Sequence, residues 1–120
     1  MVEISGSSRY QINRLRLKLF GQKLLEQVGQ SGQNLSIALV GRRKMRELMA
    51  QYHPAKQTLP VLSFPYFATE GEPEEMKMWG EVVICYPLGV LLAAEKNKTV
   101  QVMFESLVEH GVETISKNIH

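Results

Sequence analysis

The sequence predicts an α/β (α+β) fold: a single domain in which a small mixed β-sheet packs against helices. The first reason is length, because 120 residues fill one compact domain, residues 1–120, and leave no room for a second. The second is order, since apolar runs with strand character alternate with segments of helical periodicity. The third is that the sequence contains no repeats, linkers or low-complexity stretches that would divide it.

The first half of the chain predicts two strands, each followed by a helix. Val2–Ser5 is a candidate short strand, and the Gly-Ser-Ser sequence after it breaks the strand. Residues 10–28 carry apolar side chains at helical spacing with basic residues between them, which predicts a helix. Leu35–Val40 alternates well enough for a second strand. A second helix is expected to begin at Gly41 and to end before the proline at position 54.

The second half predicts two more strands and two more helices. Val61–Pro65 is a short apolar run bounded by prolines and is best explained as a strand. Residues 68–75 are acidic, contain Gly and Pro, and are expected to form a hairpin loop. A further apolar strand is expected at residues 81–86. Pro87 suits the first position of the next helix, and Thr99 is a plausible N-cap for the last one.

The overall composition argues against several classes of protein. The single Cys85 excludes an internal disulfide and suits a reducing compartment. No apolar run approaches the length of a bilayer span, and the first ten residues lack the apolar core of a signal peptide. We therefore expect a cytoplasmic protein with no membrane partner. The net charge of +2 is too small to indicate nucleic-acid binding, so the distribution of charge has to decide that question.

The last eleven residues have the spacing of a metal-binding helix and turn. His110 lies on a strongly helical stretch, and Thr114 occupies the same helical face four residues later. His120 follows after six more residues, and Glu113 could serve as a substitute ligand. A catalytic zinc normally takes three protein ligands and keeps one position for water, and a threonine hydroxyl is a poor ligand. The alternative is that His110 packs beneath the sheet and His120 belongs to a frayed terminus.

Four groups of residues, taken in their order along the chain, carry a family resemblance. They are Leu35–Val40 with Met45-Arg46-Glu47-Leu48, the Val-Leu-Ser-Phe-Pro sequence of Val61–Pro65, the Gly-Glu-Val-Val-Ile-Cys sequence of residues 80–85, and His110-Gly111 with His120. Their order and spacing resemble the bacterial YbeY family, which are metal-dependent endoribonucleases called rRNA maturation factors. The resemblance covers nearly the whole chain. It implies a YbeY-like fold, a hydrolase that acts on RNA, and zinc as the cofactor.

The same resemblance implies that the zinc site is incomplete. The zinc motif of the family is His-Gly-x-x-His-x-x-x-x-x-His, whose first and third histidines fall on His110 and His120, while Thr114 stands at the second. The zinc would then be lost or weakly bound. A functional arginine of the family falls on His53. His53 could replace it as a catalytic cation beside a phosphate, or it could be an exposed residue at the end of a helix.

The densest positive charge lies at the start of the second expected helix. It consists of Arg42, Arg43, Lys44 and Arg46. A basic surface suits a phosphate backbone, and exposed aromatic side chains could stack on bases. The aromatic candidates are Tyr52, Tyr66, Phe67 and Trp79. The alternative is a solvated helix face with the aromatic rings in the core. Basic residues at a helix N-terminus oppose the helix dipole, and this small cost favours a functional reason for the run.

These observations lead to two functional hypotheses. The first is a single-strand-specific endoribonuclease that matures ribosomal RNA during ribosome biogenesis, in which zinc would polarise a water or the scissile phosphate. The second is a catalytically inactive module that retains the fold and binds RNA or the ribosome. Thr114 separates the two hypotheses, because it stands at the position where the middle ligand is expected.

Overall fold

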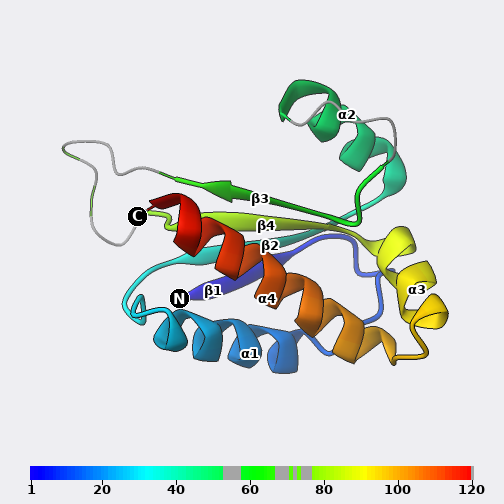
Figure 1. The fold of residues 1–120 in the computed structure, drawn as a ribbon, viewed down its shortest axis with the longest axis horizontal. Coiled ribbons are helices and arrows are strands. Elements are labelled where there is room, and N and C mark those ends of the chain that lie inside the picture. Colours follow the sequence, from blue (N-terminus) through cyan, green and yellow to red (C-terminus); the bar gives the residue numbers. More distant parts are fainter. Residues whose placement is uncertain (53–57, 67–70, 72, 74–76, 120) are drawn as a thin grey trace.

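A computed structural model of the chain describes residues 1–52, 58–66, 71, 73 and 77–119. His53, Phe67, His120 and most of the expected hairpin loop lie outside these residues. The described part of the chain contains both strands and helices (Figure 1). In order they are β1 (Val2–Ser5), α1 (Arg14–Gln27), β2 (Leu35–Val40), α2 (Arg42–Tyr52), β3 (Val61–Pro65), β4 (Gly80–Cys85), α3 (Tyr86–Glu95) and α4 (Val100–Ile119). No helix in this part of the chain combines the length and apolar character needed to cross a bilayer.

The strands form one mixed sheet in the order β1-β2-β4-β3. β1, β2 and β4 run parallel, and β3 pairs with β4 in the antiparallel sense (Figure 1). Parallel neighbours need a crossover connection, which α1 supplies between β1 and β2. The expected α/β fold with a small mixed sheet is therefore confirmed.

The side chains of the sheet alternate between two apolar clusters, one on each face. The larger cluster is formed by side chains of the sheet, α1, α3 and α4, and it includes Leu17, Ile37, Val82, Phe104 and Ile115. The smaller cluster lies beneath α2 and consists of Met45, Met49, Leu62, Val83 and Cys85. Cys85 is thus a buried core thiol. α1 and α4 cover one face of the sheet, α3 packs against α4 at the end of the strands, and α2 lies over the other face (Figure 1).

α1 begins at Arg14, four residues later than the apolar spacing predicted. The side chain of Asn13 accepts a hydrogen bond of 2.9 Å from the backbone N–H of Arg16, which is the contact of an N-cap. Tyr10 is not helical; its ring stacks on that of Tyr86 with 4.6 Å between the centroids. The cap and the aromatic pair therefore set the helix start, where apolar periodicity alone extended it too far.

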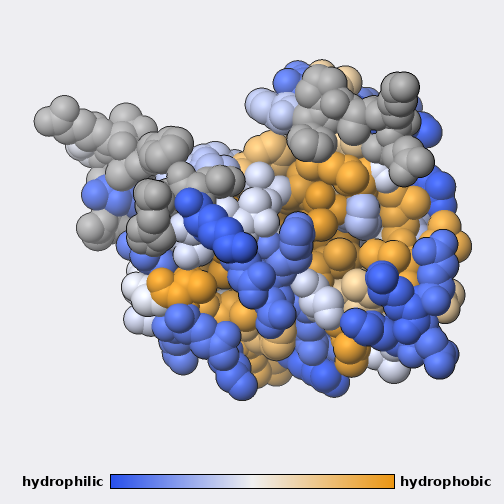
Figure 2. Space-filling view, in the orientation of Figure 1, coloured by the Kyte–Doolittle hydropathy of each residue, from blue (hydrophilic) through white to orange (hydrophobic). Residues whose placement is uncertain are grey.

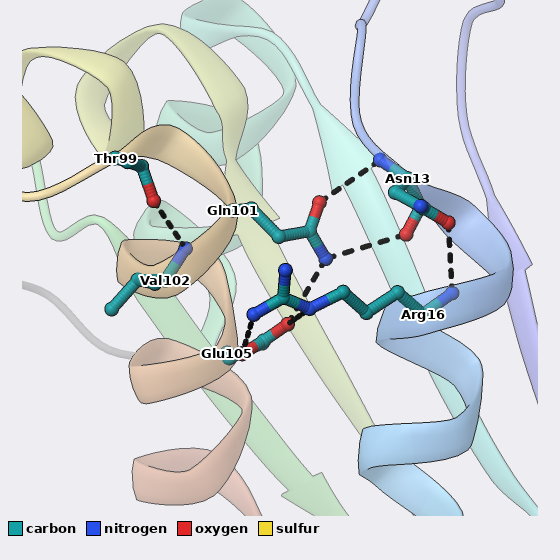
Figure 3. Close-up of polar contacts among 6 residues, drawn as sticks. All are labelled: Asn13, Arg16, Thr99, Gln101, Val102 and Glu105. Atoms are coloured by element: carbon teal, nitrogen blue, oxygen red, sulfur yellow. Dashed lines mark hydrogen bonds and ion pairs between the residues drawn. The ribbon is translucent and has the colours of Figure 1, made fainter.

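A polar network fixes the start of α4 against the start of α1 (Figure 3). The backbone N–H of Asn13 donates to Oε1 of Gln101 at 2.9 Å, and the Gln101 amide donates to Glu105 at 3.1 Å. Glu105 in turn pairs with Arg16 at 2.8 Å. The predicted N-cap is also confirmed, because the Thr99 hydroxyl accepts the backbone N–H of Val102 at 3.2 Å (Figure 3). These contacts determine where α4 starts and how it crosses the sheet.

Gly111 lets the middle of α4 lie close to β4. A Cβ atom at this position would stand 2.7 Å from Cγ2 of Val82, closer than real Cβ contacts allow. Val82 is fully buried in the larger cluster. The absence of a side chain at Gly111 is therefore a packing requirement, and it sets the height of the neighbouring His110 above the sheet.

Candidate functional site

His110 lies on the exposed side of α4, whereas its neighbours Gly111 and Val112 are buried. The interpretation of His110 as a residue packed beneath the sheet is therefore wrong. Earlier in the same helical stripe Met103 and Leu107 are buried, because that half of α4 packs beside α3 (Figure 1). Further along the same stripe His110 is exposed, so its imidazole is accessible to a metal ion or a substrate.

Thr114 occupies the position where a second ligand is expected, and its hydroxyl is already engaged. It donates a hydrogen bond of 2.9 Å to the backbone carbonyl of His110, one turn earlier in α4. This contact is the usual local bond of a threonine inside a helix. Thr114 therefore lies on the same face of α4 as His110, as the spacing predicted, but its hydroxyl is hydrogen-bonded to the helix backbone.

α4 continues as a helix through Ile119, without the turn that the sequence pattern predicted. Ile119 lies nine positions after His110, and at about 1.5 Å per residue this separates their backbones by about 13 Å along the helix axis. Three ligands on one helix of this length converge only if they lie within neighbouring turns. The described helix therefore carries the chain away from His110.

The described residues do not make a zinc site. Residues 1–52, 58–66, 71, 73 and 77–119 contain no group of three His, Cys, Asp or Glu side chains able to hold a metal ion. Glu113 is exposed and does not join His110 in such a group. Because zinc sites in enzymes take three protein ligands, this part of the chain does not by itself fit the metal. His120 lies outside the described residues.

The basic residues of α2 all face solvent. Arg42, Arg43, Lys44 and Arg46 are exposed, and Arg43 also approaches Glu47 at 3.6 Å. The buried side of the same helix is apolar, formed by Met45 and Met49. α2 therefore holds its apolar side on the sheet and presents its positive charge outward.

The aromatic candidates separate into exposed and buried rings. Tyr52 is 63% exposed and Tyr66 is 44% exposed, whereas Trp79 is 6% exposed and belongs to the core. Trp79 is therefore excluded as a ring that stacks on a ligand. The ring of Tyr52 meets Phe64 edge to face, with 5.3 Å between the centroids. The two exposed tyrosines and Phe64 line one cavity.

That cavity has a volume of about 320 Å³ and lies between α2 and the edge of the sheet. It is lined by Leu48, Tyr52, Phe64, Pro65, Tyr66 and Glu81. On the face in view, Figure 2 shows a further apolar surface between α2, α3 and α4. Leu48 and Tyr52 come from the last turns of α2, Phe64 and Pro65 from β3, and Glu81 from β4. We call this space the aromatic cavity.

Glu81 is the acidic group of the aromatic cavity. Its carboxylate accepts a hydrogen bond from the Ser36 hydroxyl at 3.3 Å and another from the Tyr66 hydroxyl at 3.5 Å. Partial burial raises the pKa of Tyr66 above its ordinary value, and the negative charge of Glu81 and its hydrogen bond raise it further. The carboxylate therefore favours protonated, donating groups beside it.

Sequence reasoning did not identify Glu81. The available signal was an acidic residue inside the otherwise apolar strand Gly80–Cys85. Its partners depend on sheet register, which pairs Glu81 with Ser36 on one side and with Phe64 on the other. Strand order and register bring these three residues together although they are distant in sequence. His110 is not part of the aromatic cavity, because none of its lining residues comes from α4.

Comparison with known protein families gives one match that spans most of the chain. A model described as Endoribonuclease YbeY matches residues 4–113. The matched segment ends one position before Thr114. The stretch in which the second and third ligands of the zinc motif would stand therefore lies outside the matched part.

Several curated proteins are similar to this chain, each described as an endoribonuclease YbeY. The protein of Azoarcus sp. strain BH72 is 35% identical over 80 residues, which are 65% of this chain and 32% of that protein. The protein of Alteromonas mediterranea is 29% identical over 80% of this chain and 60% of its own length. The protein of Acinetobacter baumannii strain ATCC 17978 is 32% identical over 88% of this chain and 69% of its own length. For the first two of these relatives, the matched region spans less than two thirds of the relative.

Proposed function

Because this chain belongs to the endoribonuclease YbeY family, we propose that it acts on single-stranded RNA as an endoribonuclease in the maturation of ribosomal RNA. The observation that carries the proposal is the construction of α2. Its first turns present the cations Arg42, Arg43, Lys44 and Arg46 to solvent. Its last turns supply Leu48 and Tyr52 to the aromatic cavity.

These two features match the two chemical parts of a single strand. Lysine and arginine side chains contact phosphates without regard to sequence, and exposed aromatic rings stack on unpaired bases. A duplex hides the faces of its bases, so a site that uses ring stacking favours single strands. The proposed site of action is the cytoplasm, a compartment that also suits the unpaired Cys85.

A second candidate function is supported by a different observation. The hydroxyl of Thr114 is bonded to the carbonyl of His110, and the described residues do not assemble three metal ligands. Both facts favour a module that binds single-stranded RNA or the ribosome without cutting. In that case the RNA contacts of α2 remain and cleavage is lost.

The two candidates are separated by assaying binding and cleavage on the same RNA. The purified chain is mixed with a labelled single strand and with a duplex of the same sequence, with added zinc or with a chelator. The endoribonuclease proposal expects cleavage of the single strand that is lost with the chelator and in the His110→Ala variant. The matched control is Glu109→Ala, which changes the exposed neighbour of His110. Binding without cleavage under every condition identifies the non-catalytic module, and no binding at low salt rejects both.

A further inference from the structure

The aromatic cavity has the size and walls of a site for one flat ring. Its volume of about 320 Å³ is at the lower end of the range of small-ligand pockets, about 300–1,000 Å³. Tyr52 and Tyr66 stay substantially exposed although each has an aromatic ring with apolar faces. Phe64 holds the Tyr52 ring in an edge-to-face contact, which fixes its orientation before a ligand arrives. A planar aromatic ligand fits these walls better than an aliphatic one.

The polar end of the cavity is built by the register of the sheet. Ser36, Glu81 and Phe64 are direct neighbours on three adjacent strands, so their side chains emerge on the same face. Glu81 is held between the Ser36 hydroxyl and the Tyr66 hydroxyl. Both contacts are long for hydrogen bonds between oxygens, which prefer 2.7–2.8 Å. A carboxylate has about four acceptor positions, so Glu81 keeps the capacity to accept bonds from a ligand.

A carboxylate selects among the four RNA bases by the donors on their pairing edges. Guanine presents two N–H donors side by side, at N1 and at the exocyclic N2, and these match the two oxygens of a carboxylate. Adenine and cytosine each present one amino donor beside a ring-nitrogen acceptor, which the carboxylate repels. Uracil presents its single N–H between two carbonyl oxygens. Single-stranded RNA is commonly read in this way, by stacking of the base and hydrogen bonding to its pairing edge.

The stripe of α2 that lines the cavity also carries a cation. Lys44, Leu48 and Tyr52 follow one another at four-residue intervals, so they lie on one face of the helix. Lys44 is exposed and stands eight residues before Tyr52, which is about 12 Å along the helix axis. A nucleotide whose base enters the cavity therefore has a positive charge within reach of the adjoining backbone.

We propose that the aromatic cavity binds one unpaired guanine of the RNA, with its ring against Tyr52 and Tyr66 and its N1–H and N2–H groups donating to Glu81. The proposal rests on the proposed function, since it names the base that the RNA site prefers. It assigns Glu81 as a specificity-determining residue. Glu81 reads a base edge and has no part in breaking the RNA chain.

The test compares three uridine oligomers that differ at one central nucleotide, which is guanosine, inosine or uridine. Inosine retains the N1–H group of guanosine and lacks the amino group at N2. Fluorescence anisotropy at low salt is expected to give the tightest binding for guanosine, roughly tenfold tighter than for uridine, with inosine between them. Tyr52→Leu should weaken binding of all three oligomers by roughly fivefold, because the ring stacks on any base.

Glu81→Gln is the deciding variant, and Glu3→Gln is its matched control. Both remove one negative charge, and both positions lie in the same cross-strand row, since Glu3 pairs with Ser36 and Ser36 with Glu81. Glu3 does not line the aromatic cavity. Glu81→Gln should reduce the preference for guanosine over uridine to less than about twofold while binding of the uridine oligomer is retained, which shows that the variant is folded. Glu3→Gln should leave the preference unchanged.

Three results would overturn the inference, and they distinguish the guanine site from the proposed function. Equal binding of the three oligomers by the unaltered protein, or an unchanged guanosine preference in Glu81→Gln, removes the guanine site and leaves the proposed RNA function standing. No binding of any oligomer at low salt removes the proposed function together with the guanine site.

Discussion

The hydroxyl of Thr114 donates a 2.9 Å hydrogen bond to the backbone carbonyl of His110. Thr114 stands where the middle metal ligand was expected, so the residue at that position is hydrogen-bonded to the first expected ligand. The bond engages the threonine hydroxyl with the helix backbone. α4 then continues to Ile119 without a break. The exposed face of α4 thus offers a single histidine within the described residues, in a chain whose residues 4–113 match the family model.

The purified protein is expected to hold clearly less than one zinc ion per chain. A site that combines His110 with His120 has two imidazoles and lacks the third protein ligand of catalytic zinc sites. Elemental analysis after purification without chelators measures the metal content directly. Full occupancy that disappears in His110→Ala would contradict this prediction and would show that the chain completes a site by other means.

Thr114→His is expected to raise zinc affinity by about tenfold or more, because a gained ligand should matter at least as much as a residue that only supports a ligand. The helix runs unbroken through both positions, so two imidazoles four residues apart share one face. Val102→His is the control, because it adds an imidazole to an exposed position of α4 two turns before His110. Zinc titration by competition with a chelating dye measures the affinities. Equal affinities of Thr114→His and the control would mean that the motif is aligned incorrectly.

Gly111→Ala is expected to lower the free energy of unfolding by about 1–2 kcal/mol. Alanine favours helix over glycine by up to about 1 kcal/mol, but the new methyl group would press into the buried Val82, and overpacking of a core costs about 1–3 kcal/mol. Gly32→Ala is the control, since a methyl group there meets no atom within 4 Å. Urea denaturation should show a lower midpoint for Gly111→Ala at an unchanged slope. A stability equal to that of the control would show that α4 lifts away from β4 at little cost.

Local patterns predicted the elements that depend on near neighbours. Val2–Ser5, Leu35–Val40 and Val61–Pro65 were delimited correctly, because apolar alternation and flanking turn residues determine a strand locally. The N-cap at Thr99 was predicted for the same reason. The start of α1 was placed too early, because the side chain of Asn13 ends the extended segment and periodicity does not record a cap.

Contacts between distant segments explain what the sequence did not reveal. His110 shares a helical stripe with the buried Leu107, and the elements that pack against α4 cover Leu107 and leave His110 exposed. The aromatic cavity needs the pairing of β4 with both β2 and β3, which brings Ser36 and Phe64 to Glu81. Neither relation is visible in a periodicity, because the first depends on what packs against α4 and the second on strand order.

Glu81→Gln is expected to lower the pKa of Tyr66. Burial makes the largest contribution to the raised pKa, so part of the elevation should remain when the charge and hydrogen bond of Glu81 are changed. Spectrophotometric titration of tyrosinate, with Tyr66→Phe to assign the Tyr66 signal, measures the midpoint in each variant. An unchanged midpoint would show that the contact between Tyr66 and Glu81 is absent in solution.

The same raised pKa predicts how stability depends on pH. The folded protein holds the Tyr66 proton more tightly than the unfolded chain, so the contribution to stability is fully present below the ordinary pKa of 10.0 and is lost as the pH rises through the folded pKa. In urea denaturation above pH 10.0, the unaltered protein should therefore lose stability more steeply than Tyr66→Phe. Parallel losses in the two proteins would assign alkaline unfolding to other groups.

Replacing Arg42, Arg43 and Lys44 together with alanine is expected to flatten the salt dependence of RNA binding. Each phosphate contact contributes about −0.7 to the slope of log affinity against log salt for single strands, so the loss should be roughly one to two units. Arg43 is also within 3.6 Å of Glu47, which is one reason to expect less than three full contacts. Binding to unrelated single strands should weaken about equally, because backbone contacts carry no sequence information.

The control variant removes the same charge elsewhere, by replacing the exposed Lys23, Lys96 and Lys98 with alanine. Anisotropy titrations at several salt concentrations give the slopes, and equal slopes for the two triple variants would assign the basic run of α2 to a solvated surface.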